Sequence, residues 1–251
     1  MTDVVHLRAG LLPAPPQRLL PTVTSRAAAV ALAMLAVLHL SAQLGHEAGW
    51  ARATQVLLMP LLALALWYAT SAPRPRLVRL VVVALGLSWL GDTAPAAFGG
   101  DAAFLVMVDC FLLAQLVYVA AFWPTRGAGV ARRPLLLVPY AVAAAALVAA
   151  CVPGAPGPLL AAVVVYGVCL VAMAVLATGV HPLAGVGGAV FLVSDAMIAL
   201  GAFTDWFAPP ASGFWVMLTY VAGQSLLVAG VLARSSSQEP GSGTGAKPAR
   251  S

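Results

Sequence analysis

Three aspartates lie inside long apolar runs of the sequence, where an ionisable side chain is rare. Asp92 stands in LGLSWLGDTAP, Asp109 in LVMVDCFLLAQLVY and Asp195 in AVFLVSDAMIAL. A carboxyl group in such a helix costs several kcal/mol to insert into a membrane and marks proton transfer, transport or ligand binding. An aspartate can also serve only to hold helices together, through a hydrogen bond to a neighbouring hydroxyl or amide. For any one aspartate alone, the two interpretations carry equal weight.

Helical phase separates the three aspartates. One face of the run around Asp109 carries aromatic and amide side chains, which are Phe104, Phe111, Gln115, Tyr118 and Phe122. At about 100° per residue, Asp109 lies roughly 180° from Tyr118, so we expect a structural role for it. In the other runs, polar side chains accompany the remaining aspartates or line facing helices: Ser88, Tyr166, Ser194, Tyr220 and Gln224. These faces are predicted to meet in one interior pocket.

The sequence gives weaker support for a metal site, a nucleophilic serine or a Schiff-base lysine. His39, Gln43 and His46 are spaced by four and three residues, with Glu47 adjacent, but they lack the tight H-E-x-x-H spacing typical of zinc hydrolases. We interpret them as interfacial polar residues and expect no metal. No G-x-S-x-G motif indicates a nucleophilic serine. A Schiff base needs a lysine within a helix, and the only lysine, Lys247, lies in the tail. No cofactor is expected.

The composition explains why these aspartates are unusual. Of 251 residues, 62% are hydrophobic and 8% are charged, whereas soluble domains have roughly 25% charged residues. The chain therefore has lipid as its solvent. Its net charge of +5 does not indicate nucleic-acid binding, because the basic residues are spread among short connections. Cys110, Cys151 and Cys169 lie in apolar runs and are interpreted as buried thiols.

A membrane-spanning helix needs about 20 mainly apolar residues, and the sequence contains eight such runs. They lie near 26–44, 51–70, 77–97, 102–123, 135–152, 157–178, 182–203 and 213–233. The prediction is an all-α bundle of eight transmembrane helices. Residues 1–25, which lack the apolar core of a signal peptide, are predicted to form a cytoplasmic arm, and residues 234–251 are predicted to form a disordered cytoplasmic tail.

Basic residues prefer cytoplasmic loops, and here they are distributed unevenly. Of the 13 Lys and Arg residues, 12 fall on the side of the two termini, and Arg52 alone lies opposite. This pattern predicts a multi-pass protein of the plasma or inner membrane with both termini in the cytoplasm. The three aspartates would then share one depth, on the order of 9–14 Å from the outer helix ends at 1.5 Å per residue.

Five segments in order resemble the YhhN family of lysoplasmalogenases. They are ALGLSWLGD (84–92), FLLAQLVYVAAF (111–122), VYGVCLVAMAVLA (165–177), AVFLVSDAMIAL (189–200) and YVAGQSLLVAG (220–230). Two positions depart from the family pattern. Ala53-Thr54-Gln55 stands where a Lys-Pro pair often opens the second span, and Gln115 stands where histidine is frequent.

The resemblance implies hydrolysis of the vinyl ether of a lysophospholipid, the lysoplasmalogen, within the membrane and without a cofactor. This reaction needs a protonated acid to deliver a proton to carbon and a negative charge to stabilise the oxocarbenium ion, as in glycosidases. Asp92 and Asp195 would share these two roles. The substrate and water would be oriented by Ser88, Gln115, Tyr118, Tyr166, Ser194, Tyr220 and Gln224.

Two other classes of function fit the same sequence. A small lipid or proton-coupled transporter would use a titrating intramembrane aspartate, and the small residue before Asp in spans three and seven hints at a duplication. A non-catalytic protein that only binds membrane lipid is the third possibility. The oligomeric state stays open.

Overall fold

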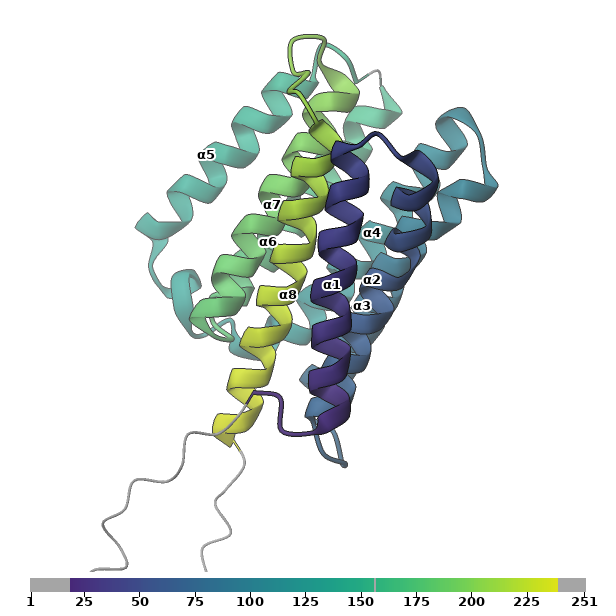
Figure 1. Ribbon diagram of the computed structural model, residues 1–251. Helices are drawn as coiled ribbons and strands as arrows, with labels where there is room; N and C mark the ends of the chain where they lie inside the picture. Colours follow the sequence, from purple (N-terminus) through teal and green to yellow (C-terminus); the bar gives the residue numbers. More distant parts are fainter. Residues whose placement is uncertain (1–18, 156, 239–251) are drawn as a thin grey trace, which may run out of the picture.

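The computed structural model describes residues 19–155 and 157–238, and these fold into long helices joined by short connections (Figure 1). The long helices are α1 (Val23–Leu44), α2 (Ala48–Ala69), α3 (Arg76–Thr93), α4 (Gly100–Phe122), α5 (Pro134–Cys151), α6 (Pro158–Ala177), α7 (Pro182–Phe203) and α8 (Ser212–Gln238). Three short 3-10 helices are η1 (Ala94–Ala97), η2 (Trp123–Thr125) and η3 (Gly129–Arg132). Within the described ranges there is no strand, and 8 helices are long and apolar enough to cross a membrane. The predicted eight-span, all-helical fold is confirmed.

The helices run up and down, so their connections alternate between two ends of the bundle. The start of α1 and the end of α8 lie at the same end (Figure 1). Helix α7 packs along α8, and α1 packs along α2, while α3 lies between α2 and α4. Helix α5 stands apart from the rest and contacts the bundle through α6, α7 and η3.

The helix ends differ slightly from the predicted spans. Helix α1 already begins at Val23, because the Oγ1 of Thr22 accepts a hydrogen bond from the Ser25 amide at 3.0 Å and caps the helix. Helix α8 continues to Gln238, beyond the predicted end at residue 233. The remainder of the predicted arm and tail, 1–18 and 239–251, lies outside the described residues.

The three cysteines are free thiols, but they differ in burial. Cys151 is buried, as predicted. Cys110 and Cys169 are only half-buried, because helical phase turns them partly toward the surface of the bundle. The interpretation of all three as buried thiols is therefore wrong for these two.

Helices α7 and α8 approach so closely that only glycine fits at their crossing. A Cβ atom built on Gly187 would lie 2.6 Å from the Leu227 amide nitrogen, and one on Gly223 would lie 2.9 Å from the Phe191 amide nitrogen. Small residues drive helix association in membranes, because they allow backbone contact where no hydrophobic force acts. This crossing fixes the position of Asp195 on α7 relative to Tyr220 on α8.

We expect Gly223→Leu to lower the thermal unfolding midpoint by about 5 °C or more, since the added side chain must push two backbones apart. The midpoint can be measured by thermal unfolding in detergent. Gly86→Leu is the matched control, because a Cβ at Gly86 meets no atom within 4 Å. Equal unfolding midpoints for the two variants would contradict the close-packing argument.

The orientation of the bundle in the membrane stays a prediction, and it rests on the basic residues. Reporter fusions in the connection at Gly127 and at the C-terminus should report the cytoplasm. Fusions near Gly99 and Ala208 should report the opposite side. The reverse pattern at these sites would show that the basic residues do not set the topology.

Candidate active site

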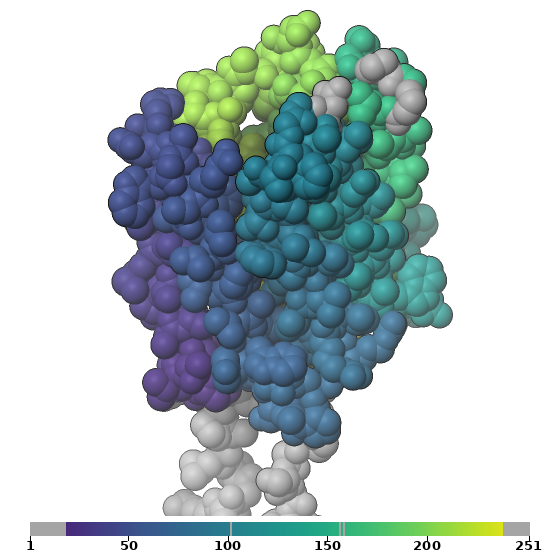
Figure 2. Space-filling view, turned by 90° about the vertical axis from the view of Figure 1, so that its right-hand side faces the viewer, coloured from purple at the N-terminus to yellow at the C-terminus, as the bar shows by residue number. Residues whose placement is uncertain are grey.

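A cavity of about 610 Å³ opens at the end of the bundle away from the termini. Figure 2 shows the surface hollowed there, beneath the connection between α7 and α8. Its walls come from α1, α2, α3, α4, α7 and α8. Its polar lining residues are Gln43, Gln55, Asp92, Ser194, Asp195, Ser212 and Tyr220. Two of the three intramembrane aspartates therefore face one space.

Asp92 lies in the last turn of α3, and hydrogen bonds hold both of its carboxylate oxygens. The Gln55 side-chain amide on α2 donates to Oδ1 at 3.2 Å. The Tyr220 hydroxyl on α8 donates to Oδ2 at 2.8 Å. Donors from two other helices thus orient this carboxylate, which suits an ionised group.

A proline on α2 helps to set the register of α2 against α3. Pro60 has no N–H, so the Val56 carbonyl, four residues earlier, has no helical partner. The indole Nε1 of Trp89 on α3 donates to that carbonyl at 2.9 Å. Gln55 precedes Val56, and Asp92 follows Trp89 by less than one turn. The same contact therefore brings Gln55 within reach of Asp92.

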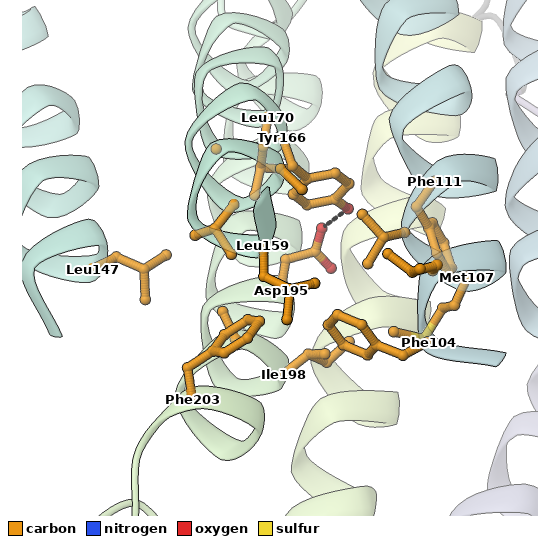
Figure 3. Close-up of a pocket in the computed structure, with 16 residues that line it drawn as sticks. Phe104, Met107, Phe111, Leu147, Leu159, Tyr166, Leu170, Asp195, Ile198 and Phe203 are labelled. Atoms are coloured by element: carbon orange, nitrogen blue, oxygen red, sulfur yellow. Dashed lines mark hydrogen bonds between the residues drawn. The ribbon is translucent and has the colours of Figure 1, made fainter. Parts of the chain in front are cut away.

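Asp195 lies on α7 and is 8% exposed. Its Oδ2 accepts a hydrogen bond from the Tyr166 hydroxyl on α6, drawn as a dashed line in Figure 3. Tyr166 is the only side-chain donor to this carboxyl among the described residues. Asp195 and Asp92 line the same cavity. Asp92 thus accepts hydrogen bonds from two side-chain donors, whereas Asp195 accepts from one.

Aromatic rings fix the tyrosine that reaches Asp92. The ring of Tyr220 lies 5.9 Å from Phe111 at an edge-on angle of 85° and 5.7 Å from Phe191. Phe111 can approach because Gly91 has no side chain, and a Cβ there would lie 2.7 Å from the ring. Such packing holds the Tyr220 hydroxyl in place without further hydrogen bonds.

A narrow apolar slot of about 70 Å³ leaves the cavity beside Asp195 (Figure 3). Asp195, Phe111, Met107 and Ile198 line both spaces. The slot continues past Gly167 on α6 to a groove of about 700 Å³ between α5 and the pair α6 and α7. Asp195 therefore stands where a polar cavity meets an apolar passage toward the lipid.

Four of the predicted site residues lie in a separate layer beneath the cavity. These residues, Ser88, Gln115, Tyr118 and Gln224, are fully buried and line none of the cavities described here. The Tyr118 hydroxyl donates to Gln224 at 2.6 Å, and the Gln224 amide donates to Ser88 at 3.2 Å. The amide of Gln115 has no hydrogen-bond partner within the described ranges. The predicted single pocket is therefore two layers, and only Asp92, Ser194, Asp195 and Tyr220 line the open cavity.

The histidine on α1 lies in the bundle interior instead of at the interface. His39 is fully buried, and its Nδ1 lies 2.9 Å from the Thr54 hydroxyl on α2. The prediction of an interfacial position is wrong for His39, because its phase on α1 faces α2. His46 and Glu47 are exposed at the end of the bundle. No cluster of metal-ligating side chains occurs in the part of the chain that the structure describes.

Three polar residues that line the cavity were not predicted as site residues: Gln43, Gln55 and Ser212. The Gln55 side chain donates a hydrogen bond to Asp92 and lines the cavity. Gln43 on α1 lines the cavity too. The sequence carries a signal for both, since a glutamine within an apolar run needs a polar partner. Asp109 is exposed on α4 and lines none of the cavities, which agrees with its predicted phase.

Comparison with known proteins identifies a family but no individual relative. The model of the YhhN family matches residues 50–231, which include α3 to α7 and most of α2 and α8. Both aspartates of the cavity lie within the matched region. No curated protein and no solved structure matches the chain.

Proposed function

Because the chain belongs to the YhhN family, we propose that it hydrolyses the vinyl ether bond of lysoplasmalogens within the membrane. The products are a fatty aldehyde and a glycerophospho-alcohol. The observation that carries this proposal is the pair Asp92 and Asp195 on one cavity, with Asp195 also at the mouth of the apolar slot. A single-chain lipid has this same division, with a polar head joined to one long hydrocarbon chain.

The two spaces match the two parts of such a lipid. The alkenyl chain enters the slot between Phe104, Phe111 and Ile198, while the glycerol and phosphate stay in the polar cavity near Gln43 and Ser212. The vinyl ether joins these parts, so it lies beside Asp195. The slot admits one chain only after its side chains move apart, which favours a lipid with one chain over a diacyl lipid.

Asp195 is proposed as the general acid. The carbon that accepts the proton is the second carbon of the alkenyl chain, on the slot side of the ether oxygen. Asp195 lines that side, and among the described residues a side-chain donor reaches only one of its oxygens. Proton transfer to this carbon forms the C–H bond, and the vinyl π electrons that supply it leave an oxocarbenium ion at the first carbon.

Asp92 is proposed as the base and as the negative charge that stabilises the oxocarbenium ion. Its carboxylate is held by Gln55 and Tyr220 on the polar side of the reacting carbon. It removes a proton from water as the water oxygen bonds to the first carbon. The hemiacetal hydroxyl then gives its proton to the ionised Asp195, while the bond from the first carbon to the glycerol oxygen breaks and that oxygen takes the proton held by Asp92. The aldehyde is released, and both carboxyl groups return to their starting states. Two carboxyl groups in different environments are a common way to divide acid and base roles.

The layer beneath the cavity supports a hydrolase over a carrier. Ser88, Tyr118 and Gln224 are fully buried and bonded to one another. They separate the cavity from the end of the bundle that holds the termini. A carrier would have to break this layer open in each cycle, whereas a hydrolase keeps it closed.

The proposal is tested by incubating purified protein in detergent with a lysoplasmalogen and measuring the aldehyde. The matched control substrate is the lysophospholipid with an ester in place of the vinyl ether. Aldehyde release from the first and no hydrolysis of the second is the expected result. Binding of both lipids without any product would instead favour a transporter or a lipid-binding protein.

Asp109→Asn is expected to retain at least about half of the wild-type activity, because this carboxyl group is exposed on α4 and lies outside the cavity. Surface substitutions away from a site usually change stability by about 0.5 kcal/mol or less. The initial rate of aldehyde release by the purified variant checks this expectation. An activity as low as that of Asp92→Asn, in a folded protein, would refute the assignment.

A further inference from the structure

A second cavity lies at the end of the bundle opposite the candidate active site, where α5 does not pack tightly against α7. A cavity of about 860 Å³ opens there between η3, α5 and the start of α7. Arg132 and Arg133 line it, together with Tyr140. It shares no lining residue with the candidate active site.

The cavity continues as an apolar seam between α5 and α7. On α7 it is lined by Val186 and Ala189, and the next turns of the same face, Leu192, Val193 and Ala196, line the groove beyond. Val186 is 53% exposed and Val193 is 49% exposed, although both face a neighbouring helix. Helix α5 visibly stands away from α7 in Figure 1. Side chains of the protein therefore leave this seam unfilled.

Charged and apolar groups follow one another along the seam in the same order as in one membrane phospholipid. Two arginines stand at its outer end, at the level where a helix leaves the membrane, and apolar side chains follow toward the middle. Tyr140 lies about 10 Å deeper than the arginines at 1.5 Å per residue and lines the same cavity. The carboxylates whose side chains the structure describes all lie in the other half of the bundle, and they are Glu47, Asp92, Asp109, Asp195 and Asp205. None of these carboxylates lines the cavity with Arg132 and Arg133, so none repels an anionic group bound there.

We propose that one phospholipid with a net negative headgroup binds between α5 and α7 and fills the seam. Its phosphate is bound by Arg132 and Arg133, and its acyl chains lie along Val186, Ala189 and Leu136. Arginine suits phosphate because its planar guanidinium donates two parallel hydrogen bonds. The lipid holds α5 against the bundle. It is a structural ligand and is distinct from any substrate of the active-site cavity.

The test uses the full chain purified in a mild detergent and titrated with phosphatidylglycerol or phosphatidylcholine. Native mass spectrometry should show one tightly bound phosphatidylglycerol. The unfolding midpoint should rise by about 4 °C or more at saturating phosphatidylglycerol, and by less with phosphatidylcholine. Inorganic phosphate alone should leave the midpoint unchanged, since it cannot fill the apolar seam.

Two variants and a control separate the site from general charge. The double variant Arg132→Ala and Arg133→Ala should weaken phosphatidylglycerol binding by about 30-fold, since each basic residue near an anionic membrane surface contributes about 1 kcal/mol. Val186→Trp, which keeps both arginines, should abolish the bound lipid by filling the seam. The double variant Arg79→Ala and Arg126→Ala removes the same charge from the same end, outside the cavity, and should bind normally.

Several results would overturn the proposal. These are equal midpoints with the two lipids, an equal loss of binding in the Arg79 and Arg126 control, or full stabilisation by inorganic phosphate. Retention of the tightly bound lipid in Val186→Trp would also place it elsewhere on the protein.

Discussion

Asp92→Asn and Asp195→Asn should each lower the rate of vinyl ether hydrolysis by about 10³-fold or more, while the protein stays folded in the membrane. Asparagine keeps the shape of the side chain, but it cannot deliver a proton to carbon or carry a negative charge. General acid–base catalysis alone typically contributes about 10²–10⁴-fold, and the lost stabilisation of the oxocarbenium ion adds to it. Initial rates of aldehyde release by purified variants measure the effect.

The control for folding is the thermal unfolding midpoint, which should not fall in either variant. Replacing the ionised Asp92 with a neutral amide removes a cost of burying charge, and replacing the protonated Asp195 exchanges one neutral hydrogen-bonding group for another of the same size. The wild-type rate should also pass through a maximum in pH, because one carboxyl group must be protonated while the other is ionised. Either variant retaining more than about a tenth of the wild-type activity would remove that aspartate from the mechanism, since even small acid–base effects exceed it.

Gly167→Phe should lower kcat/KM for a long-chain lysoplasmalogen by about 100-fold. Gly167 lines both the slot and the groove beyond it, and a Cβ at this position meets no atom within 4 Å. The phenyl ring can therefore enter the slot without a backbone clash and occupy the path of the hydrocarbon chain. Each buried CH₂ group of the chain contributes about 0.8 kcal/mol to binding. Excluding a few of these groups from the slot therefore accounts for an effect of this size. The measurement compares substrates with long and short alkenyl chains.

The effect should depend on the chain length of the substrate. A substrate whose alkenyl chain is too short to reach Gly167 should be hydrolysed by the variant at a rate close to that of the wild type. Gly86→Phe is the matched control, because Gly86 also has open space around it and lines none of the cavities. An equal loss for short and long chains would show that the chain does not use the slot.

The sequence predicted the fold well because the bilayer imposes a simple rule. Eight runs of suitable length correspond to α1 through α8, and the resemblance to the YhhN family is confirmed by the match over residues 50–231. Helical phase also separated Asp109 from the other two aspartates. Phase fixes the direction of a side chain around its own helix, and Asp109 is exposed while Asp195 is buried.

The arrangement of the site was harder to predict, because phase does not give depth or contact between helices. Tyr220 and Gln224 share a face of α8, yet Tyr220 lines the cavity and Gln224 lies in the closed layer one turn below. The contact between Gln55 and Asp92 depends on the register of α2 against α3. That register depends in turn on the carbonyl freed by Pro60 and its bond to Trp89. No periodicity within one helix contains this information.

The most direct test of the two-carboxylate mechanism is hydrolysis in heavy water. If an acid in the cavity protonates carbon, the aldehyde released by the wild type carries one deuterium on the carbon next to the carbonyl. Rapid reduction to the alcohol preserves this label for mass spectrometry. The expected result is a singly labelled product from the wild type and almost no product from Asp92→Asn and Asp195→Asn. An unlabelled aldehyde, or a labelled one formed equally fast by both variants, would contradict catalysis by this pair.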